Sequence, residues 1–159
     1  MEEDIKTPNP TEMSVAQDPV YQYSLFLENR VGALADVVRL LNEAGVDVLG
    51  VSLIDSVDLV VARMILSDPD TAKAILMEKG ISFSETELVV VELREGASEL
   101  HRCLTALVVA ETNIHFTYPL MNRPFGRTLL AMCVEDTEFG ANALHAAGFK
   151  VLCQGDLSR

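Results

Sequence analysis

The sequence predicts an α+β protein built from two βαββαβ units in tandem, each an antiparallel sheet with its helices on one face. Apolar residues alternate in short segments and recur at helical spacing in longer ones, in the order strand, helix, strand, strand, helix, strand. The same order then follows a second time. Residues 64–68 resemble residues 132–136, and residues 80–81 resemble 148–149, at a constant offset of 68. These observations indicate an internal duplication.

The first half of the chain supplies the first unit. Residues 1–19 are polar, contain three prolines and lack periodicity, so we expect a flexible tail there. We place the first unit at residues 20–86 and the second at residues 87–159. The elements expected in the first unit are a strand over 20–28, a helix over 32–44, strands over 46–53 and 57–66, and a helix from Pro69 that ends at Gly80.

The second unit repeats this order. Its expected elements are a helix over 97–111, strands over 114–120 and 128–134, a helix from Asp136 or Thr137 that ends at Gly148, and a strand over 149–153. Only residues 81–93 remain to close the first unit and to open the second. Thirteen residues of strand span roughly 43 Å. We therefore expect one continuous or slightly bent strand that joins two sheets, rather than two short strands.

Charge and hydropathy exclude several classes of function. The net charge is −12, from 24 acidic and 12 basic residues, and a nucleic-acid partner would need a basic face. No apolar run is long enough to span a bilayer, and the first residues are acidic where a secretory signal would be basic. We therefore expect no nucleic-acid partner, no membrane association and a cytoplasmic location.

Cysteine and histidine do not form a recognisable site. The three cysteines, Cys103, Cys133 and Cys153, are isolated from one another, so we expect small buried apolar residues rather than metal or redox groups. None of the three histidines is followed by a second ligand three or four residues later. We expect no metal, no cofactor and no catalytic residue, although the lack of a motif does not exclude catalysis.

The turn between the first strand and the first helix, residues 29–32, is the most informative local feature. A helix start offers free backbone N–H groups and the positive end of the helix dipole, which together suit a carboxylate. Gly32 carries no side chain that would keep a ligand from the backbone. The same pattern also fits a turn that binds nothing, in which Asn29 only caps the helix.

A βαββαβ unit of about seventy residues matches the ferredoxin-like architecture. With the apolar strand 25–27, the polar turn 28–31, Gly32-Ala33-Leu34, and Ala44-Gly45-Val46 at the end of the helix, the chain resembles the ACT-domain family over residues 20–157. The resemblance is to small tandem proteins that bind amino acids, some of which are similar to regulatory subunits such as that of acetolactate synthase.

The resemblance implies that a small amino acid binds between two ACT units, against the start of the first helix. Carried over to this chain, the turn side of the site is Asn29, Arg30, Val31, Gly32, Ala33 and Leu34. The facing side is Val48, Leu49 and Gly50 of the second strand, or Thr117 and Tyr118 of the second unit. Backbone N–H groups near Gly32 would take the carboxylate, and Leu34 would touch the ligand side chain.

The function expected from this resemblance is a non-catalytic regulatory module that binds a small amino acid, and its expected partner is an enzyme of amino-acid biosynthesis. A homodimer is also implied, and Phe26, which interrupts the polar strand face of Gln22 and Ser24, indicates that a second face is covered. Two alternatives remain. One is a small enzyme that acts on an amino or keto acid, and the other is a purely structural oligomerisation module.

Three further features remain open at this stage. Glu95 and Glu99, at the helix start of the second unit, would repel a carboxylate, so we expect a competent site in the first unit only. Arg63 lies inside an apolar strand, where it either pairs at a sheet edge or lines the cleft between the units. Residues 118–126 form an unusual loop that is either a partner contact or a turn packed on the sheet.

Overall fold

The computed structural model describes residues 18–121 and 126–158 of the chain. The first unit comprises β1 (Val20–Glu28), α1 (Ala33–Glu43), β2 (Val48–Asp55), β3 (Leu59–Leu66) and α2 (Pro69–Glu78). β4 (Phe83–Leu93) follows, and then come η2 (Gly96–Glu99), α3 (Leu100–Val109), β5 (Ile114–Pro119), β6 (Thr128–Val134), α4 (Thr137–Ala146), β7 (Val151–Leu152) and α5 (Gln154–Leu157). The predicted α+β class and the repeated element order are confirmed. Of the expected tail, only Asp18 and Pro19 lie among the described residues.

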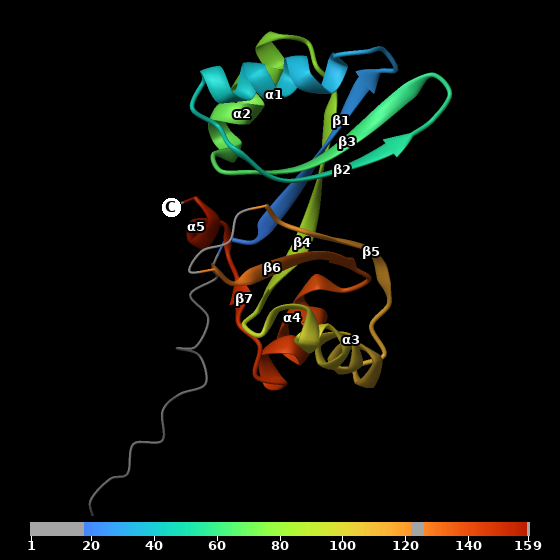
Figure 1. Ribbon diagram of the computed structural model, residues 1–159, viewed down its shortest axis with the longest axis vertical. Coiled ribbons are helices and arrows are strands. Elements are labelled where there is room, and N and C mark those ends of the chain that lie inside the picture. The colour runs from blue at the N-terminus through green and yellow to red at the C-terminus, as the bar shows by residue number, and fades with distance from the viewer. Residues whose placement is uncertain (1–17, 122–125, 159) are drawn as a thin grey trace, which may run out of the picture.

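β4 belongs to both units, as the sequence predicted. Residues 83–88 of β4 pair with β1, and residues 89–93 pair with β6. The strand order β2-β3-β1-β4 of the first unit is therefore repeated as β5-β6-β4-β7 in the second, and all pairs are antiparallel. Figure 1 shows β4 running from the upper layer of the molecule into the lower one. The boundary that we expected between residues 86 and 87 falls inside this strand.

The two sheets face each other, and the helices cover their outer faces (Figure 1). α1 and α2 pack on one side of the first sheet over a buried cluster that includes Leu25, Leu41 and Met64. α3 and α4 pack in the same way on the second sheet. A third buried cluster lies between the sheets and draws on both units, with Ile65 from β3 and Leu129 from β6. The units therefore share a core in addition to a strand.

The duplication extends to the ends of the helices. Asp68 caps α2 by accepting a hydrogen bond from the Thr71 N–H at 3.2 Å, and Asp136 caps α4 by accepting from the Phe139 N–H at 3.0 Å. Gly80 and Gly148 follow the two helices with φ angles of 68° and 89°. A side-chain oxygen satisfies a free N–H at a helix start, and only glycine adopts positive φ without strain. The predicted caps are confirmed.

Two parts of the fold differ from the expectation. Gln22 and Ser24 are buried, at 1% and 8% exposure, whereas Phe26 is 42% exposed. The covered part of this strand face is its polar part, because Tyr118 of the second unit donates a hydrogen bond to Gln22 Oε1 at 2.8 Å. The helix expected over 97–111 begins with the 3₁₀ helix η2, and the α-helix starts only at Leu100.

The short helix α5 is an addition that the pattern of apolar residues did not predict. Asp156 accepts a hydrogen bond from the Cys153 N–H at 2.9 Å and so fixes the first turn. Gln154 Nε2 donates to the Leu66 carbonyl of the first unit at 3.0 Å, and Leu157 is buried between the sheets. α5 therefore ties the end of the second unit to the first. Among the described residues, no helix has the length and apolar character needed to cross a membrane.

Candidate functional site

The turn before α1 presents open backbone donors. Gly32 is the N-cap residue with a φ angle of 87°, in the left-handed region, and no side chain caps the helix. Within the turn, the N–H groups of Arg30, Ala33 and Asp36 donate to backbone carbonyls. In the described part of the chain, the N–H groups of Leu34 and Ala35 have no such acceptor. They are two of the free donors that every helix start carries, and no described residue satisfies them.

The side chains of the turn leave these donors open to solvent. Asn29 reaches away from α1, and its Nδ2 lies 3.5 Å from the carbonyls of Ser56 and Val57 in the β2–β3 turn. Arg30 lies 3.1 Å from Asp36 in an exposed ion pair, which orients its guanidinium along the helix start. Val31 is fully exposed. Asn29 therefore does not cap α1, in contrast to one of the two sequence interpretations.

A groove of about 390 Å³ opens beside this helix start. Gly32, Ala33, Leu34 and Ala35 form one side of it. Leu53 of β2 and Val60 of β3 contribute to the other side. The residues that carry the open donors thus line a groove with an apolar wall, which Glu28 and Arg30 also border.

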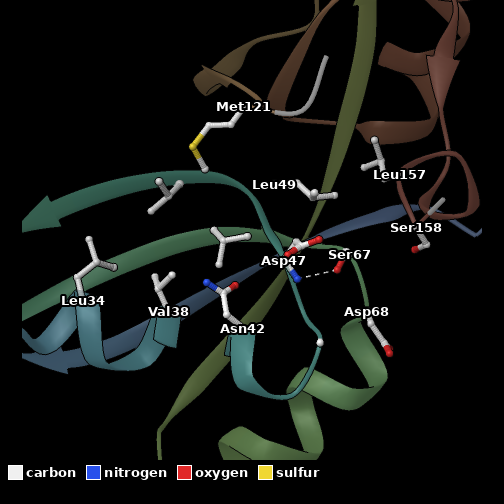
Figure 2. Close-up of a pocket in the computed structure, with 13 residues that line it drawn as sticks. Leu34, Val38, Asn42, Asp47, Leu49, Ser67, Asp68, Met121, Leu157 and Ser158 are labelled. Atoms are coloured by element: carbon white, nitrogen blue, oxygen red, sulfur yellow. Dashed lines mark hydrogen bonds between the residues drawn. The ribbon is translucent and has the colours of Figure 1, made fainter. Parts of the chain in front are cut away.

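A larger cavity of about 920 Å³ lies further along α1. Leu34, Val38 and Asn42 follow one another on the face of α1 that borders it, and Figure 2 shows them in a row along the helix. These positions recur every four residues, which is the spacing of one helix face. Val48 and Leu49 line the cavity from β2. Leu34 lines both cavities, so the two openings adjoin along the same helix.

The second unit closes this cavity. Met121 follows β5, and its N–H donates to the Leu49 carbonyl at 2.7 Å. Leu157 and Ser158 approach from α5, on the other side in Figure 2. Sequence reasoning named Met121 only as part of the loop 118–126. It missed Leu157 and Ser158, because a lone apolar residue in a polar terminal segment carries no periodic signal.

Three of the expected site residues lie elsewhere: Gly50 and Tyr118 in the contact between the units, and Thr117 on the exposed part of β5. Tyr118 is buried, and its ring lies 3.4 Å from the position that a Cβ atom on Gly50 would occupy. The absent side chain of Gly50 therefore makes room for this ring. Thr117 is exposed on β5, where its hydroxyl donates to the Ala131 carbonyl at 2.8 Å. Burial raises the pKa of the Tyr118 hydroxyl, with a smaller opposing effect from Arg63.

Arg63 also lies between the units. Its guanidinium carbon is 3.8 Å from the ring centre of Phe116 on β5, a cation–π contact across the facing sheets. Arg63 thus lines the inter-unit contact, the second of the two interpretations that the sequence left open. The unusual loop falls partly outside the described residues, since residues 122–125 are among those not described.

At the helix start of the second unit, a side chain of the protein, the Glu99 carboxylate, occupies the position that a ligand carboxylate would need. Glu99 accepts a hydrogen bond from the Glu95 N–H at 2.9 Å and lies 2.6 Å from Arg102. These contacts lower the pKa of Glu99, the backbone hydrogen bond first. A fixed carboxylate at this start repels a second one, in keeping with the expected difference between the units.

The cysteines and acidic residues form no metal site within residues 18–121 and 126–158. Cys103 and Cys133 are buried and Cys153 is half-buried, all three as free thiols. Burial raises the pKa of Cys103 to about 11. A protonated buried thiol is a poor nucleophile and a poor ligand, so Cys103 acts as a packing residue.

Comparison with solved structures finds the same fold. Protein BT0572 from Bacteroides thetaiotaomicron superimposes with a TM-score of 0.81 at 22% identity, covering 90% of this chain and 98% of that chain. The ligand-free regulatory subunit of aspartate kinase from Thermus thermophilus gives a TM-score of 0.54 at 15% identity, covering 84% and 95%. The corresponding subunit from Thermus flavus gives 0.50 at 18% identity, also covering 84% and 95%.

The comparison with curated proteins finds no match. A family model described as an ACT domain pair matches residues 19–144, which is most of the chain. This match spans both units and the strand that they share. The chain therefore belongs to the ACT domain pair family.

Proposed function

We propose that this chain is a non-catalytic regulatory module that binds a small amino acid where α1 begins. Membership of the ACT domain pair family supports regulatory ligand binding in general. The observation that carries the finer proposal is the pair of open N–H groups at Leu34 and Ala35, beside a groove of about 390 Å³. Two such donors and the positive helix end attract an α-carboxylate.

The proposed ligand lies with its carboxylate at the helix start and its side chain along α1. Gly32 and Ala33 allow close approach to the backbone, and Leu34 contacts the ligand side chain. Arg30 adds positive charge next to the carboxylate, although Asp36 neutralises part of it. Val48 and Leu49 form the far wall, within the larger cavity. Gly50 and Tyr118 act behind that wall by fixing β2 against the second unit.

We also propose that two copies associate through the free end of the first unit. Six of its large apolar side chains are exposed there, and a patch of this kind commonly marks an interface: Phe26, Val31, Leu53, Ile54, Val57 and Leu59. β2 is the last strand of the described sheet on that side. Two antiparallel β2 strands are related by a two-fold axis, so a second copy fits this edge.

Sedimentation of the full chain tests the dimer. We expect a mass of two chains, and a shift to one chain for Leu53→Lys, because a lysine on an edge strand opposes pairing. A matched exposed change in the second unit, Val108→Lys, should leave the dimer intact. Equal masses for wild type and Leu53→Lys would reject this interface.

Two further parts of the proposal concern the cell. A regulatory module of amino-acid metabolism would act in the cytoplasm on a partner enzyme, because the ligand can change an enzyme only if it favours one arrangement of the complex over another. Affinity capture with the full chain, with and without the amino acid, tests this. An enzyme whose retention changes with the amino acid supports the proposal, and retention that ignores it opposes it.

A thermal-unfolding panel with the twenty amino acids at millimolar concentration tests ligand binding directly. A ligand at a hundred times its dissociation constant adds about 2.7 kcal/mol to stability, which raises the midpoint by several degrees. We expect one amino acid or a small group of related ones to do so. A flat panel would contradict the proposal and favour a structural module, and turnover of an amino or keto acid would favour an enzyme.

A further inference from the structure

The larger cavity has a charge character opposite to that of the helix start. It lies at the end of α1 and the beginning of β2, where Asn42, Asp47 and Asp68 mark its polar side. Among the described residues that line it there is no lysine, arginine or histidine. The two charged side chains are both carboxylates. An anionic ligand group would therefore meet repulsion here, whereas a cationic group would be attracted.

The carboxylate of Asp47 is placed to receive a donor. The backbone of Asp47 is held on both sides, because its N–H donates to the Ser67 hydroxyl at 2.8 Å and its carbonyl accepts from the Ser67 N–H at 3.0 Å. Figure 2 shows the first of these bonds as a dashed line among the residues that line the cavity. Among the described residues, no ion pair or hydrogen bond involves the Asp47 carboxylate. Its backbone is fixed while its charge remains available.

Asp68 and α1 add to the negative potential. The Asp68 carboxylate stays charged because it accepts hydrogen bonds from the hydroxyl and the N–H of Thr71, which lower its pKa. α1 ends nearby, and its last turn contains no basic residue. The negative end of the helix dipole therefore points to the same side of the cavity as the two carboxylates.

The remaining walls are apolar. Leu34 and Val38 of α1 and Val48 and Val51 of β2 lie on the first unit's side. Met121 and Leu157 complete the cavity from the second unit. A concave space of this volume, with an apolar lining and a few polar groups at one end, is typical of small-molecule sites. Its geometry suits a ligand with one charged end and one apolar end.

We propose that this cavity binds a small amphipathic primary amine. Its ammonium group lies at the Asp47 carboxylate, with the Asn42 amide oxygen as a second acceptor. Its apolar part lies between α1 and β2, under Met121. This site shares the apolar walls of Leu34, Val48 and Leu49 with the proposed amino-acid site, but its polar groups lie at the other end of α1 and select a cation without a carboxylate. Because both units build the walls, the bound amine also stabilises their contact.

Three compounds with the same branched chain form a matched set of probes: 3-methylbutylamine, leucine and 4-methylpentanoate. Calorimetric titration of the full chain should give binding of the amine and none of the carboxylate at the same concentration. Asp47→Asn should weaken amine binding at least tenfold, since hydrogen bonds to charged groups are the strong ones. Asp55→Asn, at the last residue of β2 and outside the cavity, is the control and should not change the affinity.

A second variant guards against a folding defect in Asp47→Asn. Asn42 is exposed near the end of α1, where lysine is a good helix former and its charge suits the helix end. Asn42→Lys should therefore fold and abolish amine binding, because it places a cation where the ammonium group would lie. Retained binding in either variant, equal loss in Asp47→Asn and Asp55→Asn, or no binding of the amine would each overturn the proposal. Binding of 4-methylpentanoate that Asp47→Asn weakens as much as it weakens amine binding would overturn it too.

The amino-acid panel is scored separately from this set. A response to an amino acid without a response to amines rejects the amine site and leaves the proposed function intact. A response to amines without a response to any amino acid rejects the proposed function and leaves the amine site intact.

Discussion

The two units share one topology but differ at the start of their first helices. In the first unit, Gly32 opens α1 and leaves the N–H groups of Leu34 and Ala35 without an acceptor in the described chain. In the second, η2 and the Glu99 carboxylate occupy the equivalent corner. The structural caps of the second helices, Asp68 and Asp136, are by contrast the same in both. The two units thus share the caps of their second helices and differ at the starts of their first helices.

The units also differ on the faces that meet each other. On the first sheet, Gln22, Ser24 and Arg63 lie on the face toward the second sheet. On the second sheet, the aromatic rings of Phe116 and Tyr118 lie on the facing side and contact Arg63 and Gln22. Hydrogen bonds and a cation–π contact need particular partners, whereas apolar contact does not. This polar part of the contact therefore fixes one relative orientation of the two sheets.

The largest expected loss of stability comes from the two buried clusters that lie between each sheet and its helices. Leu41→Ala in the first unit and Leu107→Ala in the second each remove a fully buried side chain, so each should lower the free energy of unfolding by about 2–5 kcal/mol. Because β4 and the central cluster are common to both units, both variants should still unfold in a single transition in urea. Two separate transitions in either variant would show that the units are independent.

A smaller effect is expected at the contact between the sheets. Tyr118→Phe removes the donor to Gln22 and leaves a buried oxygen without a partner, at a cost of about 1–3 kcal/mol in urea-induced unfolding. Tyr21→Phe is the control, because Tyr21 is only half-buried and its hydroxyl is in no hydrogen bond that the described residues show. Equal stability of the two variants would mean that the Tyr118 hydroxyl contributes nothing to the contact.

The helix caps should give the smallest effects and the best agreement between the units. Asp68→Ala and Asp136→Ala should each cost about 1 kcal/mol at neutral pH, since each removes an N-cap acceptor. Chemical denaturation of both variants beside wild type measures this. A loss of stability in only one of the two variants would show that the two caps have the same geometry but contribute differently to the free energy of unfolding.

The Asp68 cap also predicts a pH dependence. Hydrogen bonds from Thr71 lower the pKa of Asp68 in the folded state below its ordinary value of 3.8. The stability that comes from the charged form is therefore present above that value and is lost as the pH falls through the lower, folded-state pKa. The difference in unfolding free energy between wild type and Asp68→Ala should shrink as the pH falls below 3.8. A difference that stays constant down to pH 2 would contradict this origin of the cap.

The sequence predicted the parts of the fold that local rules determine. Helix caps, glycine ends and the shared strand followed from spacing and chain length, because each depends on a few neighbouring residues. The contact between the sheets did not, because Gln22, Ser24 and Arg63 resemble solvent-facing residues until the partner that covers them is known. α5 was missed for the same reason, as Leu157 is a single apolar residue whose burial depends on the fold.

The candidate site was predictable only in part. The strand-turn-helix corner was identified from Asn29, Gly32 and Leu34, and the structure places Gly32 and Leu34 on a groove. Val48 and Leu49 do line a cavity. The space beside Gly50, however, is occupied by the ring of Tyr118. Spacing can indicate that a strand has room for a ligand or for another chain segment. It cannot say which of the two takes that room.

The central claim is that the start of α1 receives a ligand carboxylate, and Ala35→Glu tests it most directly. Ala35 is exposed in the first turn of α1, where a glutamate favours the helix, so the variant should fold at least as well as wild type. Ala35→Gln is the control of equal size without the charge. With the amino acid that gives the largest shift in the panel, we expect calorimetric affinity to fall at least tenfold in Ala35→Glu and to change much less in Ala35→Gln. Equal affinities in the two variants would contradict the claim.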